Sequence, residues 1–138
     1  MRENTRDFII LKFGGTSLSS KKKWATISQV IKQKNTVTTR PIVVCSALSQ
    51  VSNQLEKLIT KALTGDHLPI IERLKTQHNE LLESLKADSA KPQLEDLFAN
   101  IVKLCHGISL IGSAPPSLKA RIMAFGEILS TTEFASVK

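Results

Sequence analysis

Aromatic side chains are scarce in this chain of 138 residues: tyrosine is absent, and Phe, Trp and Tyr together make up 4%. Proteins that bind single-stranded nucleic acid stack bases on such side chains, so this class is not favoured although the net charge is +7. The charge instead favours small anionic partners such as phosphates and nucleotides. No apolar run approaches the ~20 residues that cross a bilayer, and the charged start lacks the apolar core of a signal peptide. We expect neither a nucleic-acid nor a membrane partner.

Cysteine is limited to Cys45 and Cys105, which have no close spacing. Such sparse cysteines suit a reducing compartment, so the sequence predicts a cytoplasmic protein. We interpret both as buried small apolar residues rather than as a disulfide or a pair of metal ligands. No metal site is therefore predicted.

The apolar pattern predicts two strands joined by a helix. Residues 8–13 form a nearly continuous apolar run of the kind buried in a parallel sheet, and residues 41–45 form another. Between them, Ser19 or Ser20 can cap a helix that runs to about Lys34. Strand, helix and strand at this spacing predict a parallel βαβ unit, and hence an α/β fold.

The rest of the chain is expected to be helical. Apolar residues recur at helical spacing over 49–63, 70–85, 92–107 and from 117 onward. We expect the third of these helices to stop at Gly107, with Cys105-His106 as its end. His67 and His78 are expected at the surface or the edge of the core. No glycine or proline ends the last helix before Lys138, so we expect a chain that is cut rather than finished.

Two consecutive glycines, Gly14 and Gly15, follow the first predicted strand in the segment FIILKFGGTS. Glycine at such a place costs roughly 0.5–1 kcal/mol relative to alanine, so the pair needs a reason. One reason is a tight turn from strand to helix; the other is the close approach of a phosphate to bare backbone amides. Lys12 favours the second, because it can offset phosphate charge during transfer. The motifs G-x-x-x-x-G-K-[ST] and G-x-G-x-x-G are absent, so this would be a phosphate site of another type.

Three segments, in order, carry a resemblance to a known family. LKFGGTS (residues 11–17) resembles the N-terminal signature of aspartokinases, which belong to the amino acid kinase family. VVCSALSQVSNQL (43–55) is similar to their strand-to-helix segment, and FGEILST (125–131) to their GE-x-x-S helix segment. The resemblance implies that residues 1–138 form the N-terminal part of a kinase domain, an incomplete α/β/α sandwich truncated at its C-terminal end. It implies that the base pocket and a catalytic aspartate lie beyond, so the chain alone is expected to be inactive.

The resemblance also implies an activity and a site. The activity is the ATP-dependent phosphorylation of the L-aspartate β-carboxylate to 4-phospho-L-aspartate, which begins lysine, threonine and methionine biosynthesis, with ATP and Mg²⁺ as co-substrate in a homo-oligomer. The implied residues are Lys12, Phe13, Gly14 and Gly15 at the ATP phosphates, with Lys12 catalytic, Ser46 and Ser52 at aspartate, and Glu127 at its α-ammonium group. Hydroxyl groups and free amides at a helix start suit a carboxylate, and a carboxylate suits an amine.

The sequence departs from the family pattern at two positions. Gln50 stands where the family has glycine, and Ser52 stands where it has threonine. The segment KKKW (residues 21–24), mainly through Trp24, resembles the corresponding segment of aspartokinases fused to a diaminopimelate decarboxylase. Without the resemblance, Ser46 and Ser52 are equally well turn or cap residues, and Glu127 is an ordinary surface carboxylate.

Two rival functions remain open from the sequence. One is a family kinase for another carboxylate or carbamate, such as glutamate, acetylglutamate or carbamate. The other is a non-catalytic binding or assembly module that retains the glycine pair for its fold.

Overall fold

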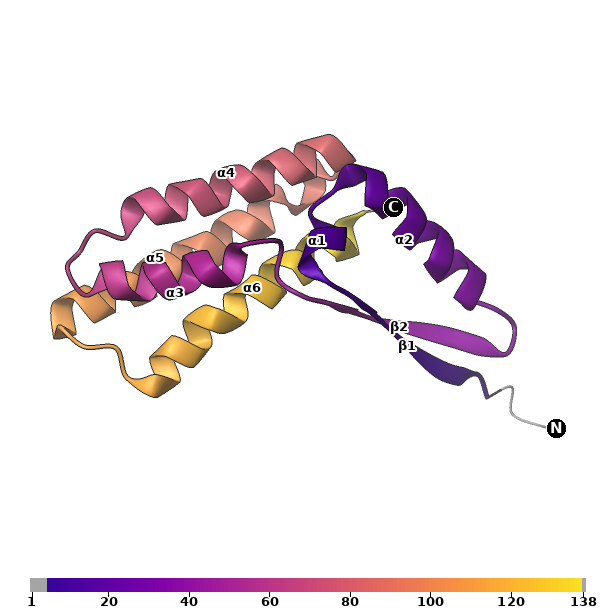
Figure 1. Cartoon of the computed structure of the whole chain (residues 1–138), viewed down its shortest axis with the longest axis horizontal. Helices are drawn as coiled ribbons and strands as arrows, with labels where there is room; N and C mark the ends of the chain where they lie inside the picture. Colours follow the sequence, from indigo (N-terminus) through magenta and orange to yellow (C-terminus); the bar gives the residue numbers. More distant parts are fainter. Residues whose placement is uncertain (1–4, 138) are drawn as a thin grey trace.

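A computed structural model describes residues 5–137 and divides them into a short sheet with its covering helix and a bundle of four long helices (Figure 1). The elements, in chain order, are β1 (Asp7–Phe13), α1 (Gly15–Leu18), α2 (Lys21–Lys34), β2 (Thr39–Cys45), α3 (Val51–Ala62), α4 (Leu68–Leu85), the 3-10 helix η1 (Asp88–Ala90), α5 (Lys91–Ile111) and α6 (Pro116–Ser136). The predicted α/β class with its strand–helix–strand start is confirmed.

The sheet consists of β1 and β2, which pair in parallel with Ile10 opposite Ile42 and Phe13 opposite Cys45. Side chains alternate between two faces along each strand, because successive Cβ atoms point to opposite sides. Helix α2 covers one face. On the other face Phe8, Ile10, Ile42 and Val44 are exposed by 65%, 70%, 45% and 42%. We call these four side chains the open apolar face.

The four long helices α3, α4, α5 and α6 pack against one another and hold most of the core (Figure 1). Their fully buried side chains include Leu55, Leu58, Ile71, Leu74, Leu82, Leu94, Ile101, Ile108, Ile122 and Leu129. The C-terminal part of α6 returns beside α2, where the rings of Phe134 and Trp24 lie 5.3 Å apart. This contact joins the bundle to the layer that covers the sheet. Within residues 5–137, no helix is long and apolar enough to cross a bilayer.

One helix boundary predicted from the sequence is wrong. Helix α5 does not stop at Gly107 but continues to Ile111, and the left-handed Gly112 (φ 78°) ends it. Ile108 is fully buried one residue beyond Gly107. Core packing of that side chain outweighs the roughly 1 kcal/mol that an internal glycine costs a helix. Cys105 and His106 therefore lie inside the helix and do not form its end.

The placement predicted for two histidines is also wrong. His67 and His78 are buried, with 6% and 0% of their surface exposed. His78 lies on the apolar stripe of α4, and its Nδ1 atom is hydrogen-bonded to the carboxylate of Glu133 from α6. Both side chains of this pair are fully buried. The pairing explains how a polar ring is accommodated in the core.

Candidate functional site

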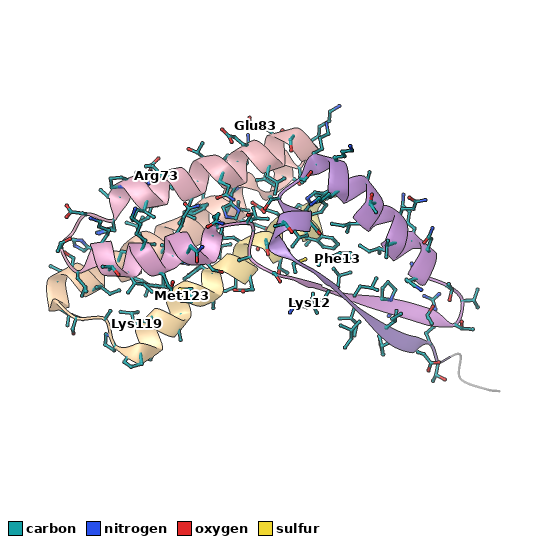
Figure 2. The ribbon with its side chains drawn as sticks, viewed as in Figure 1. Lys12, Phe13, Arg73, Glu83, Lys119 and Met123 are labelled. Atoms are coloured by element: carbon teal, nitrogen blue, oxygen red, sulfur yellow. The ribbon has the colours of Figure 1, made fainter. Side chains whose placement is uncertain are left out.

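The candidate site lies where the strands end and the helical bundle begins. β1 runs into residues 14–19, which contain the single-turn helix α1 and which we call the glycine loop, and β2 runs into residues 46–50, the serine loop. Because parallel strands deliver their carboxyl ends to one edge, the two loops are neighbours. The Ser46 N–H donates a hydrogen bond to the Phe13 carbonyl oxygen over 3.1 Å. Figure 2 shows Lys12 and Phe13 at this junction.

The two glycines have different surroundings. A Cβ atom on Gly15 would lie 2.3 Å from the Ala47 carbonyl oxygen, whereas a Cβ atom on Gly14 would meet nothing within 4 Å. Neither glycine has a left-handed backbone; among the described residues, positive φ values occur at Gly65 and Gly112 and at two non-glycine positions. Gly15 is therefore required by the close approach of the serine loop. Gly14 leaves open space beside its backbone, as access for a ligand requires.

Helix α6 closes the site from the bundle side. A Cβ atom on Gly126 would lie 2.8 Å from the Ala47 Cβ atom, so this glycine lets α6 approach the serine loop. The Ser130 hydroxyl lies 2.6 Å from the Ser46 carbonyl oxygen and 3.2 Å from that of Glu127. It thereby ties the helical turn that carries Glu127 to the serine loop. The three segments with family resemblance, far apart in sequence, meet at this point.

The predicted site residues are mostly accessible. Lys12, Gly14, Ser52 and Glu127 are exposed, and the remaining three, Phe13, Gly15 and Ser46, are half-buried. Lys12 stands on the same side of the sheet as the open apolar face and forms no ion pair with a carboxylate of residues 5–137. Ser52 lies in the first turn of α3, where backbone N–H groups have no partner within the helix. The assigned roles of these residues stay predictions.

Gln50 occupies a position that favours glycine. Its φ is 66° and its ψ is −3°, in the left-handed region, and it forms the N-terminal boundary of α3. Its side-chain oxygen accepts a hydrogen bond from the Asn53 amide over 2.8 Å. A non-glycine residue in this region costs about 1–2 kcal/mol. This explains physically why glycine suits this position in the family pattern.

Three side chains to which the sequence assigns no role at the site hold the serine loop. They are Ser19, Gln77 and Ser130. The sequence predicts Ser19 or Ser20 as the cap of α2. Ser20 takes the N-cap position but makes no side-chain cap bond, and the Ser19 hydroxyl is bonded to Gly15 and Ser49 instead. The spacing of Ser130 three residues after Glu127 was a usable signal, because residues three apart share a helix face. No local signal marks Gln77.

The thiols are unsuited to nucleophilic chemistry. Cys45 and Cys105 are buried and unbridged, as expected. Burial raises the pKa of Cys45 and raises that of Cys105 to about 11. Because the thiolate is the reactive form, both side chains act as small apolar residues. Residues 5–137 also contain no group of three or more His, Cys, Asp or Glu side chains placed to hold a metal ion.

Comparison with known proteins identifies the family. Residues 7–137 match the family model described as "Amino acid kinase family". The chain belongs to the amino acid kinase family. The sequence is 28% identical over 138 residues to the bifunctional aspartokinase/homoserine dehydrogenase of Buchnera aphidicola, covering 93% of this chain. It is 24% identical over 132 residues to the chloroplastic aspartokinase 2 of Arabidopsis thaliana, covering 92% of this chain. The resemblance to aspartokinases is confirmed.

Solved structures confirm the amino acid kinase fold. E. coli aspartokinase III in complex with lysine and aspartate (T-state) matches with a TM-score of 0.79 at 23% identity, over 96% of this chain and 29% of that chain. The same enzyme in complex with aspartate and ADP (R-state) matches with a TM-score of 0.79 over 28% of its chain. This chain spans 16% of the Buchnera protein and 24% of the Arabidopsis protein. It therefore corresponds to one part of these relatives.

Proposed function

We propose that this chain forms the aspartate-binding and phosphate-binding part of an aspartokinase. The reaction would transfer the γ-phosphoryl group of ATP to the β-carboxylate of L-aspartate and release ADP and 4-phospho-L-aspartate. The observation that supports it best is the meeting of the glycine loop, the serine loop and the Glu127 turn at one edge of the sheet. These are the three segments that resemble aspartokinases. Mg²⁺ would enter with the ATP phosphates.

Each predicted side chain would have a distinct task in this reaction. Lys12 would offset the charge on the phosphoryl group in flight, a role that suits an exposed lysine with no carboxylate partner among the described residues. Gly14 would let the phosphates approach its amide, since no side chain stands there. Ser46 and Ser52 would orient the aspartate carboxylates. Glu127 would pair with the α-ammonium group and so favour an amino acid as substrate.

The test is a hydroxamate-trapping assay on the full-length protein with ATP, Mg²⁺ and a panel of carboxylates. We expect L-aspartate to be preferred to glutamate, acetylglutamate and carbamate. Preference for another member would support the rival kinase assignment. No turnover with any acceptor would support the non-catalytic module.

Two substitutions test the assigned roles within the same assay. Lys12→Ala should lower kcat by about 100-fold or more, because loss of one preorganised donor costs roughly 2.7–4 kcal/mol in the transition state. Glu127→Gln should raise the aspartate KM much more than the ATP KM, since a charge-assisted hydrogen bond contributes roughly 1.5–3 kcal/mol. Lys119→Ala, which changes an exposed lysine in the first turn of α6 away from Lys12 (Figure 2), is the control and should change neither. A Lys12→Ala enzyme within threefold of the wild type would contradict the phosphate role.

Finer assignments follow from this proposal. An aspartokinase would serve lysine, threonine and methionine biosynthesis, and would bind ATP and aspartate as a homo-oligomer. The buried, unbridged cysteines suit the cytoplasm. The relatives that match include fusions with a homoserine dehydrogenase, and a fusion with a diaminopimelate decarboxylase stays a prediction.

A further inference from the structure

One hydroxyl group lies between the glycine loop and the serine loop. The Ser19 Oγ atom is 2.7 Å from the Gly15 carbonyl oxygen and 2.8 Å from the Ser49 backbone nitrogen. A serine hydroxyl has a single proton to donate and lone pairs with which to accept. It must donate to the Gly15 carbonyl and accept from the Ser49 N–H, since neither of those groups can take the opposite role. Ser19 therefore links the two loops: its donated bond fixes the hydroxyl within the glycine loop, and its accepted bond reaches the serine loop.

The carbonyl group of Ser49 is held by a different element from its N–H group. The Gln77 side-chain nitrogen, on α4, donates to the Ser49 carbonyl oxygen over 3.0 Å. The Gln54 side-chain nitrogen donates in turn to the Gln77 oxygen over 3.1 Å. The orientation of both amides follows from the Ser49 carbonyl, which only accepts. The N–H and C=O groups of Ser49 are thus fixed from two directions.

Each loop also has contacts that do not involve Ser19. In the glycine loop, the Leu18 N–H donates to the Gly14 carbonyl oxygen. In the serine loop, the Ser46 carbonyl oxygen accepts a hydrogen bond from the Ser130 hydroxyl, and the Ser49 carbonyl oxygen accepts one from the Gln77 side-chain nitrogen. Loss of the Ser19 hydroxyl would therefore leave each loop formed. What it would remove is a restraint on the distance between them.

We propose that Ser19 is a positioning residue that sets the glycine loop against the serine loop. The inference rests on the proposed function, in which one loop holds the phosphoryl donor and the other its acceptor carboxylate. Phosphoryl transfer depends on alignment of these two groups far more than on covalent participation by the protein. A Ser19 variant should therefore bind both substrates normally and react slowly.

The experiment compares Ser19→Ala, Ser19→Thr and the control Ser20→Ala in the full-length protein. Ser20 is adjacent and makes no side-chain cap bond. We expect Ser19→Ala to lower kcat about tenfold, which corresponds to about 1.4 kcal/mol, while KM for each substrate stays within threefold. Ser19→Thr keeps the hydroxyl and should return kcat to within threefold of the wild type. Ser20→Ala should behave as the wild type in every measurement.

A second variant and a second measurement distinguish failure of the proposed function from failure of the positioning role of Ser19. Gln77→Met removes the other support of Ser49 and should also lower kcat with little change in KM. Amide hydrogen exchange at Ser49 should accelerate in Ser19→Ala and not in Ser20→Ala. An inactive wild type would contradict the proposed function. The exchange rate of the Ser49 amide would still show whether the Ser19 hydroxyl restrains the serine loop. An active wild type with unchanged kcat in Ser19→Ala and Gln77→Met would overturn the positioning role, as would a Ser19→Thr enzyme as slow as Ser19→Ala.

Discussion

Two adjacent glycines can be needed for different reasons, and Gly14 and Gly15 are an example. Gly15→Ala would place a methyl group 2.3 Å from the Ala47 carbonyl oxygen, so the serine loop must move. We expect a loss of about 1–3 kcal/mol in the free energy of unfolding, as for other overpacked sites. Gly14→Ala meets open space at φ −78° and ψ 165°, which alanine adopts readily, so its effect should stay within about 0.5 kcal/mol. Urea unfolding followed by circular dichroism measures both, and equal losses would contradict this division.

The sequence shows that the glycine pair is unusual but not which neighbour needs it. FIILKFGGTS predicts either a tight turn or the close approach of a phosphate at the pair, whereas the structure shows a protein group packed against Gly15. The approaching group is the Ala47 carbonyl, which lies beyond an intervening helix and strand. Contacts of this kind depend on tertiary packing, so no local pattern reports them. The same reason hides Gln77, whose partner Ser49 is fixed only once α4 packs on α3.

At the scale of elements, the His78–Glu133 pair fastens α4 to α6 inside the core. Both side chains are fully buried, and no other hydrogen-bond partner within the described residues reaches the Nε2 atom of His78 or the Oε2 atom of Glu133. Removing one member leaves a buried polar group without its partner, which typically costs 3–5 kcal/mol. Replacing both by apolar residues of similar size is often neutral.

A double-mutant cycle tests this pair. We expect His78→Leu alone and Glu133→Leu alone each to lower the free energy of unfolding by about 3 kcal/mol or more. The double variant should be more stable than either single variant, because no unpaired polar atom remains. Urea titration at one pH supplies all four values. Additive losses would show that the two side chains do not depend on each other.

The same pair predicts a dependence of stability on pH. Burial raises the pKa of Glu133 above its ordinary value of 4.5, against the opposing effect of the hydrogen bond and charge of His78. The folded state thus holds this proton more tightly than the unfolded state. The resulting stabilisation is complete below about pH 4.5 and is lost as the pH rises through the pKa of the folded state. Glu133→Gln cannot titrate, so the wild type should lose stability relative to this variant as pH rises, and a constant difference would contradict the prediction.

Elements were predictable to different degrees for physical reasons. The helices α3 and α4 carry clear apolar stripes, and their approximate positions follow from the sequence. The end of α5 does not, because the burial of Ile108 against the bundle overrides the local effect of Gly107. His78 was expected at the edge of the core because its partner Glu133 lies on another helix, 55 residues away. Local sequence patterns indicate which face of a helix is buried and where a helix roughly lies. The end of a helix and the pairing of buried polar side chains depend on the elements that pack against them.

At the scale of the whole molecule, the open apolar face predicts self-association of the 138-residue chain. The face is formed by Phe8, Ile10, Ile42 and Val44, and both strands of the pair also have an unpaired edge within the described residues. Such surfaces favour pairing with another copy. Light scattering after size-exclusion chromatography should give a mass above that of the monomer.

A matched pair of substitutions locates the contact. Ile10→Lys places one charge on the open apolar face and should raise the dissociation constant for self-association at least tenfold. Val37→Lys adds a charge at an exposed apolar residue outside the strands and should leave association unchanged. Equal weakening by both changes would indicate a general effect of charge.

The supports of the serine loop also have a consequence for the order in which the molecule forms. Ser19, Gln77 and Ser130 lie 30, 28 and 84 residues along the chain from the atoms that they hold. Closing such separations costs chain entropy before any contact is gained, so these bonds form after the local helices. The serine loop would then be among the last segments to acquire its final shape. During refolding, the Ser49 amide should gain protection from hydrogen exchange later than the amides of α5. The candidate site would then form late in folding and would not belong to the folding nucleus.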